Sequence, residues 1–151
     1  MDRTEGFGVS LDRTLKKIQS TFLSAFAEHD IDLTIEQWVI LRKVYLLGIN
    51  ASQAEISNTN FRNRATTSRV IRGLCKKGLL RKSHFVNDQK RFRLEITNKG
   101  QKLMTRVMPV IKDIRKMSIQ NIEDSEFDIF LKVLDQIWEN YDQYQIKQIF
   151  S

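Results

Sequence analysis

The sequence has very few of the residues that build cross-links and metal sites. It holds one cysteine, Cys75, and two histidines, His29 and His84. A single cysteine cannot form an internal disulfide, and this favours a reducing cytosol. The histidines are far apart in the sequence and have no cysteine or clustered carboxylate beside them, which argues against a zinc site. We therefore expect no metal and no cofactor.

Long apolar runs are also missing. The most apolar stretch, residues 38–49, is interrupted by Arg42 and Lys43 and is too short to span a bilayer. The first ten residues carry charge and glycine instead of an apolar leader. There is no glycine-rich phosphate loop, and nothing places a nucleophile on a strained turn. We expect a soluble cytoplasmic protein that is not an enzyme.

The chain has an excess of positive charge, and that charge is concentrated in its middle. The net charge is +7 and the pI is about 9.7, which favours an anionic partner. Between Phe61 and Arg93 the only acidic residue is Asp88. The basic residues of that interval are Arg62, Arg64, Arg69, Arg72, Lys76, Lys77, Arg81, Lys82, Lys90, Arg91 and Arg93. After residue 119, by contrast, acidic residues predominate.

The pattern within this basic region predicts a helix-turn-helix. Ser52 and Glu55 form a capping box for a short helix, residues 58–60 suit a turn, and Asn63 caps a second helix that stops at Gly78. One side of the second helix is predicted to be buried: Thr67, Val70, Ile71 and Leu74. The opposite side is small, polar and basic: Ala65, Ser68, Arg69 and Arg72. Such a face suits the major groove of DNA, although a solvated surface helix has a similar pattern.

A basic hairpin is predicted directly after that helix. Leu80–Phe85 and Arg91–Ile96 have the character of strands, and the polar residues 86–90 read as the loop between them. Lys90 and Arg91 are then near the tip of a wing, from which they could reach phosphates or a minor groove. The alternative is an edge hairpin whose lysines only prevent aggregation.

The flanking segments are predicted to be amphipathic helices. The first has an apolar stripe, with Ser10 as its N-cap: Leu11, Leu15, Ile18, Phe22 and Phe26. The next begins with a Thr34–Gln37 capping box and ends at Gly48. Pro109 should kink or divide a later helix. The last helix, with Asp124 or Ser125 as its N-cap, carries more apolar surface than one small lobe can bury, which suggests dimerisation.

These residues resemble the MarR family of bacterial winged helix-turn-helix regulators. The resemblance rests on SQAEIS at residues 52–57, NRATTSRVIRGLCKKGLL at residues 63–80, and Asp88-Gln89-Lys90 ahead of ITNKG at residues 96–100. The family's wing carries Asp-x-Arg, and Lys90 stands here where arginine is usual, so either Lys90 or Arg91 is the wing contact. The resemblance implies a homodimer with interlocked terminal helices, which places two recognition helices in successive major grooves about 34–36 Å apart.

The resemblance also implies a mainly α fold with a small two- or three-stranded β-wing. We expect three regions in one intertwined domain: residues 1–33 and 101–151 for dimerisation, and residues 34–100 for DNA binding. The predicted function is a homodimeric transcriptional regulator, a repressor, that recognises a pseudo-palindromic operator in double-stranded DNA. The family's regulators are in many cases released from DNA by a small aromatic or anionic effector. The alternative is a dimeric winged-helix adaptor that binds protein or RNA without sequence-specific DNA recognition.

Two sets of candidate residues follow. The predicted DNA-binding residues are Arg62, Arg64, Ala65, Thr66, Ser68, Arg69, Arg72, Lys90 and Arg91. The candidates for contact with an effector are Phe22, Phe26, Trp38 and Tyr45, although aromatics at helical spacing also suit core packing. Cys75 is flanked by two lysines that could lower its pKa, which would suit a redox sensor. The family's cysteine sensors, however, place the thiol in the first helix.

Overall fold

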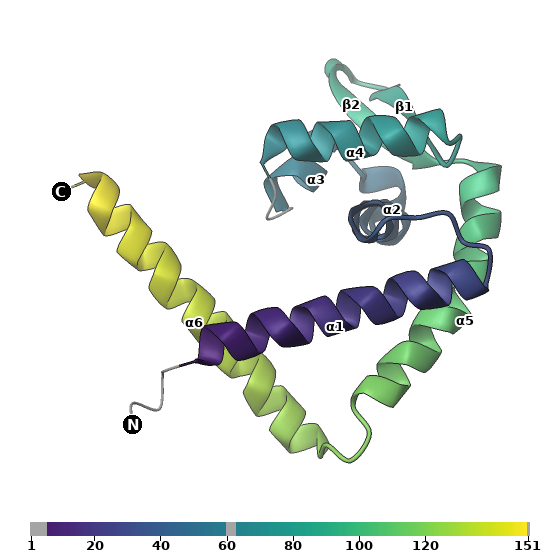
Figure 1. Cartoon of the computed structure of the whole chain (residues 1–151). Helices are drawn as coiled ribbons and strands as arrows, with labels where there is room; N and C mark the ends of the chain where they lie inside the picture. Colours follow the sequence, from purple (N-terminus) through teal and green to yellow (C-terminus); the bar gives the residue numbers. More distant parts are fainter. Residues whose placement is uncertain (1–5, 60–62, 151) are drawn as a thin grey trace. The chain divides into compact units, whose positions relative to one another are not determined.

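The computed structural model describes residues 6–59 and 63–150, and in these ranges it is mainly helical with one two-stranded antiparallel sheet (Figure 1). The elements are α1 Phe7–Glu28, α2 Ile35–Leu47, the 3-10 turn η1 Gly48–Asn50, α3 Gln53–Thr59, α4 Arg64–Lys76, β1 Leu80–Phe85, β2 Asp88–Ile96, α5 Asn98–Ser118 and α6 Asp124–Phe150. The predicted fold class is confirmed. The chain forms two compact units, residues 1–112 and 113–151.

The first two helices begin with different kinds of cap. The predicted N-cap Ser10 is wrong, because α1 starts one turn earlier: Gly6 takes a φ of 81°, and its carbonyl accepts from the Ser10 N–H at 3.0 Å. The capping box of α2 is confirmed. The Gln37 N–H donates to the Thr34 hydroxyl at 3.1 Å, and the Thr34 N–H donates to Gln37 Oε1 at 3.2 Å. The helix ends at Leu47, and Gly48 follows with a positive φ of 53°.

The helix-turn-helix is formed by α3 and α4. The Ser52 hydroxyl accepts from the Glu55 N–H at 3.0 Å, and the Asn63 side chain accepts from the Thr66 N–H at 2.8 Å. The predicted turn is partly wrong, because Asn58 still belongs to α3. After α4, Gly78 takes a φ of 71° and its N–H donates to the Cys75 carbonyl at 2.9 Å, which ends the helix as predicted.

The wing has the first strand that was predicted and a longer second one. Asp88, Gln89 and Lys90 belong to β2, so the predicted five-residue loop is reduced to residues 86–87. A shift of register after His84 lets the chain turn tightly, which the alternating pattern alone does not show. Ser52 forms an isolated bridge with Arg93 in β2, so the base of the wing is tied to the start of α3.

The core of the first unit is made by the end of α1, by α2, α3, α4 and the wing, and by α5 as far as Ile111. Its largest fully buried side chains are Phe26, Ile40, Leu41, Val44, Ile56, Ile71, Leu74, Leu80, Leu94, Met104, Val107 and Ile111. At the edge of this core the Thr97 hydroxyl donates to the Gly78 carbonyl at 2.6 Å and accepts from the Gly100 N–H at 3.0 Å. Thr97 thus caps α5, as predicted, and joins it to the end of α4.

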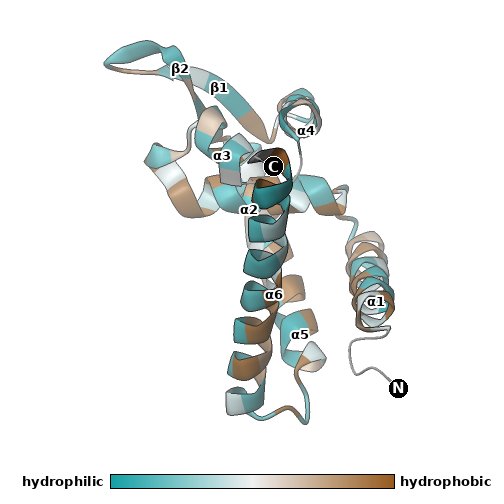
Figure 2. Cartoon of the chain, turned by 90° about the vertical axis from the view of Figure 1, so that its left-hand side faces the viewer, coloured by the Kyte–Doolittle hydropathy of each residue, from teal (hydrophilic) through white to brown (hydrophobic). Residues whose placement is uncertain are grey.

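The second unit contains the end of α5 and the whole of α6. Pro109 is exposed and α5 continues through it to Ser118, so the helix is not divided. The N-cap position of α6 is Glu123 and not Asp124 or Ser125, because the Phe127 N–H donates to the Glu123 carbonyl at 3.0 Å. Apolar residues recur along α6 (Figure 2). Those exposed within the described chain include Ile129, Phe130, Leu131, Val133, Trp138, Tyr141, Tyr144, Ile146 and Ile149.

Within residues 6–59 and 63–150, no helix is both long enough and apolar enough to cross a membrane.

Candidate nucleic-acid interface

Helix α4 separates an apolar side from a basic side. Thr67, Ile71 and Leu74 are fully buried against the rest of the unit. On the other side Ala65, Arg69 and Arg72 are exposed and Ser68 is half-buried; Thr66, in the first turn, is also half-buried. Neither guanidinium, of Arg69 or of Arg72, makes a hydrogen bond or ion pair with any other described residue. Two arginines with all their donors free can therefore meet an anion or a base edge.

The first turn of α4 is joined to α3. The Arg64 guanidinium donates to Asn58 Oδ1 at 3.3 Å, and this orients it along the end of α3. The positive end of the α4 dipole lies in the same turn, so both the dipole and the charge of Arg64 favour an anion there. The remaining predicted residue of this region, Arg62, lies outside the described residues.

A groove of about 330 Å³ lies between α3, the first turns of α4 and strand β2. Its lining residues are Ser52, Gln53, Ala54, Ser57, Arg64, Ser68, Lys90, Arg91 and Phe92. Four residues that the sequence predicted as DNA contacts therefore share one groove, although 26 positions separate Arg64 from Lys90 in the numbering. Ser57, Gln53 and Phe92 were not predicted as site residues. Phe92 alternates with Leu94 and Ile96 along its strand, which gives no sign of a site residue, and it is 44% exposed.

The two wing cations have different surroundings. The Lys90 N–H donates to Asp88 Oδ1 at 3.0 Å, which fixes the backbone beside the turn, and the Lys90 ammonium has no partner among the residues that the structure describes. The guanidinium of Arg91 lies 4.7 Å from the centroid of the Phe85 ring. On the wing face that continues to buried Leu94, the rings of His84 and Phe92 are in contact, with their centroids 5.0 Å apart and their planes tilted by 34°. Lys90 therefore has the freer charge, while Arg91 is held partly by an aromatic ring.

Two other basic residues of the wing share one acidic partner within the protein. Glu95 accepts from Arg81 Nε at 2.6 Å and is paired with Arg93 Nη1 at 3.4 Å. The hydrogen bond from Arg81 lowers the pKa of Glu95 below its ordinary value, although burial opposes this shift. These arginines contribute to the basic composition of the segment, but Glu95 balances one of their two positive charges.

Cys75 and the aromatic candidates are part of the packing around α4 and α2. Cys75 is half-buried, and its burial raises the pKa of the thiol, although Lys82 acts in the opposite direction. The expectation that neighbouring lysines lower this pKa is therefore wrong. Phe26 is 1% exposed and Trp38 4%, and their rings meet edge to face with centroids 6.4 Å apart. Phe22 is half-buried beside Phe26, and Tyr45 is exposed, so an effector contact by these four residues stays a prediction.

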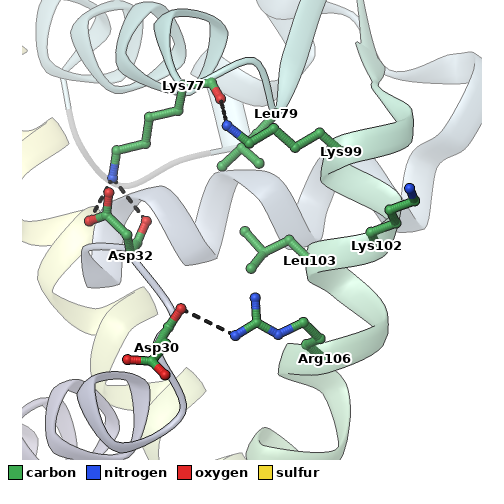
Figure 3. Close-up of a pocket in the computed structure, with 8 residues that line it drawn as sticks. All are labelled: Asp30, Asp32, Lys77, Leu79, Lys99, Lys102, Leu103 and Arg106. Atoms are coloured by element: carbon green, nitrogen blue, oxygen red, sulfur yellow. Dashed lines mark hydrogen bonds and ion pairs between the residues drawn. The ribbon is translucent and has the colours of Figure 1, made fainter.

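A basic pocket of about 320 Å³ lies at the other end of α4 (Figure 3). It is lined by Asp30, Asp32, Lys77, Leu79, Lys99, Lys102, Leu103 and Arg106. Its residues come from the α1–α2 connection, the end of α4 and the first half of α5. Most of its cations donate to backbone carbonyls in the pocket wall. In the parts of the chain that the structure describes, no group of three or more His, Cys, Asp or Glu side chains is placed to hold a metal ion.

Comparison with known proteins agrees with this architecture. Residues 33–92 match the model of the MarR family. A curated relative, the HTH-type transcriptional repressor YetL of Bacillus subtilis (strain 168), is 24% identical over 102 residues. That match covers 64% of this chain and 61% of the relative, so the chain spans about three fifths of the relative's length.

Solved structures show the same fold. Bordetella bronchiseptica BpsR, whose DNA binding is regulated by 6-hydroxynicotinic acid, superposes with a TM-score of 0.76 at 22% identity, covering 91% of this chain and 96% of that chain. The MepR–DNA complex of S. aureus gives a TM-score of 0.79 at 17% identity, covering 89% of this chain and 97% of that chain. Residues 33–92, which hold most of the winged helix-turn-helix, are therefore similar to the MarR family, and the chain shares the fold of these solved regulators.

Proposed function

We propose that this protein is a transcriptional regulator that binds double-stranded DNA through α4 and the wing. The observation that carries the proposal is the free basic face of α4, with Arg69 and Arg72 unpaired among the described residues, beside a groove that also holds Lys90 and Arg91. Sequence relatives and structural neighbours agree with this role, since one is named a transcriptional repressor and another was solved as a DNA complex.

The contacts divide into two kinds. The small and hydroxyl side chains Ala65, Thr66 and Ser68, together with Arg69, suit the base edges of a major groove, because they leave room for close approach and supply donors. Arg64, Arg72 and Lys90 suit backbone phosphates, which set position without reading sequence. Lys90, whose ammonium has no partner among the described residues, is the proposed wing contact, and Arg91, which lies against the Phe85 ring, is the alternative. Arg62 belongs to the same proposed surface.

The regulator acts as a homodimer that recognises a pseudo-palindromic operator. Support comes from the apolar side chains that α1 and α6 leave exposed, among them Leu15 at 52% and Trp138 at 57%. Burial of such surface between two chains would contribute about 25 cal/mol for each Å² removed from water. We assign residues 1–33 and 101–151 to dimerisation and residues 34–100 to DNA binding. Repression is the favoured direction of control, since the curated relative is a repressor.

Release from DNA by a small aromatic or anionic effector completes the proposal. BpsR provides the precedent, since 6-hydroxynicotinic acid regulates its DNA binding. In this chain Phe26 and Trp38 are already packed into the core, whereas the basic pocket of Figure 3 offers both room and positive charge for an anion.

Selection from a pool of random duplexes with the purified full chain tests the function. A regulator should enrich a two-fold symmetric sequence and prefer it over random DNA by at least about a thousandfold at physiological salt. Sedimentation of the selected complex should give two chains per duplex. Weak affinity that is indifferent to sequence would contradict the proposal and favour an adaptor that binds protein or RNA.

A further inference from the structure

A second cluster of contacts lies at the C-terminal end of α4, beyond Arg72. Lys77 is the C-cap residue of that helix. Its ammonium donates to the Asp32 carbonyl at 2.9 Å and to Gln37 Oε1 at 2.9 Å, and it lies 3.2 Å from Asp32 Oδ1. We call these three residues the Lys77 clasp; Figure 3 shows its Asp32 side.

The donor inventory separates Lys77 from the other basic residues of this region. An ammonium group has three hydrogens, and here three acceptor atoms surround it. It therefore has no hydrogen left for a DNA phosphate unless the clasp opens. The neighbouring Lys76 is exposed and has no hydrogen bond or ion pair with another described residue. Two adjacent lysines of equal formal charge thus have different surroundings.

The acceptors of the clasp are themselves held in place. Gln37 belongs to the capping box of α2, where its Oε1 also accepts from the Thr34 N–H at 3.2 Å. Helix α4 approaches Gln37 closely, because a Cβ added at Gly73 would lie 3.2 Å from Gln37 Nε2. Glycine at this position therefore lets the end of α4 rest on the start of α2.

Helix α5 secures the same junction from the other side. Lys99 donates to the Lys77 carbonyl at 2.8 Å, and Arg106 donates to the carbonyls of His29 and Asp30 at 2.7 and 3.2 Å (Figure 3). The end of α1, the start of α2, the end of α4 and the first half of α5 are thereby joined by side chain to backbone bonds. Two parts of this junction reach the end of α4: the clasp, through the Lys77 ammonium, and Lys99, through the Lys77 carbonyl.

When a rigid helix rotates about one end, the displacement of its other end grows with the length of the helix. Helix α4 has 13 residues, so its axis is roughly 20 Å long at about 1.5 Å per residue. A rotation of about 5° at Lys77 would move the first turn by roughly 2 Å. Donor–acceptor distances in hydrogen bonds vary only between about 2.7 and 3.2 Å, so a displacement of that size would break a hydrogen bond made by the first turn. Alongside the core packing of Ile71 and Leu74, the angle at the clasp therefore affects where Arg69 and the first turn of α4 lie.

We propose that Lys77 is a positioning residue for DNA recognition: its ammonium fixes the angle of α4 through Asp32 and Gln37 and does not contact DNA. This inference rests on the proposed DNA-binding function. It predicts that loss of the clasp weakens operator binding without removing a phosphate contact.

The first experiment compares two matched variants of the full chain, Lys77→Gln and Lys76→Gln, which lose the same charge from adjacent positions. Operator affinity is measured by fluorescence anisotropy over a range of salt concentrations. We expect Lys77→Gln to bind about tenfold more weakly, comparable to one misplaced base contact, with the salt slope of the wild type. Lys76→Gln should stay within about threefold of the wild type, or lower the slope by about one if it meets a phosphate.

A second variant disturbs the clasp without any change of charge. Gly73→Ala places a methyl group against the Gln37 amide, yet alanine raises helix propensity by about 1 kcal/mol, so the fold should persist. We expect weaker operator binding with the wild-type salt slope. If Lys77→Gln is unfolded at the assay temperature, as shown by a thermal melt, Gly73→Ala decides the question alone.

The outcomes separate this inference from the function on which it rests. A wild-type chain with no sequence preference would contradict the proposed function, and the positioning role would fall with it. If the wild type prefers its operator, two results contradict only the positioning role. One is wild-type affinity in every folded clasp variant, and the other is a salt slope for Lys77→Gln that is lower by about one unit.

Discussion

The arginines of the central segment differ in whether their charge is free, and this difference allows a matched test of the DNA-binding face. Arg69 is exposed on α4 without a partner among the described residues, whereas Arg81 is bound to Glu95 at 2.6 Å. We predict that Arg69→Ala weakens specific DNA binding and that Arg81→Ala leaves it nearly unchanged. Both variants remove the same side chain from the same basic region, so a loss due to net charge alone would affect them equally.

The magnitude follows from the interaction that Arg69 is placed to make. A bidentate arginine–guanine pair contributes roughly 1–3 kcal/mol of discrimination, which corresponds to about a 5- to 150-fold loss of affinity. Because Arg69 makes no internal bond within the described chain, its removal should cost little stability. The change in the melting temperature of the free protein should therefore be small, and the loss should appear in binding.

The assay is a gel-shift or anisotropy titration on the selected operator and on a duplex with the central bases of each half-site replaced. Arg69→Ala should reduce the difference between the two duplexes, because the side chain that reads the base is absent. Unchanged operator affinity for Arg69→Ala would remove this residue from the site. Equal losses for Arg69→Ala and Arg81→Ala would show that general charge, and not a defined face of α4, controls binding.

Three further predictions concern the wing and its base. Replacing both Lys90 and Arg91 with alanine should weaken binding to all duplexes alike and flatten the salt slope by about one unit for each phosphate that is no longer bound; a selective loss on the operator alone would contradict a backbone role. Thr97→Val should lower stability by about 1–2 kcal/mol, because it removes the N-cap of α5 and leaves the part-buried Gly100 N–H without its acceptor, whereas Thr105→Val, an exposed threonine within α5, should change little in the same thermal melt. Since Arg81 lowers the pKa of Glu95 in the folded chain, the pair stabilises the fold above the ordinary pKa of glutamate and loses this effect as the pH falls through the lowered value. Glu95→Gln should therefore be less stable than the wild type at pH 7 and approach it in acid, and a difference independent of pH would argue against this pair.

Local sequence patterns were sufficient to predict most of the helices and strands and their caps. The Thr34–Gln37 capping box, the Asn63 cap, the Gly78 stop and the extent of β1 all appear as predicted, because each depends on residues within a few positions of one another. The predictions were wrong where the same residues suited two different local structures. The start of α1 moved from Ser10 to Gly6, and the wing loop shortened to residues 86–87 because the register shifts at the turn.

The candidate site was predictable in its residue types and not in its arrangement. Sequence alone determined that α4 has a basic face and that a basic hairpin follows, since helical and strand periodicities sort side chains by face. Only the tertiary structure decided which charges are free: Glu95 neutralises Arg81 from 14 positions away, and Asp32 and Gln37 occupy Lys77 from 45 and 40 positions away. The tertiary structure also decided the direction in which the pKa of Cys75 is shifted, because burial of the thiol raises it. Contacts between distant segments depend on how helices and strands pack, and no local spacing in the chain records that packing.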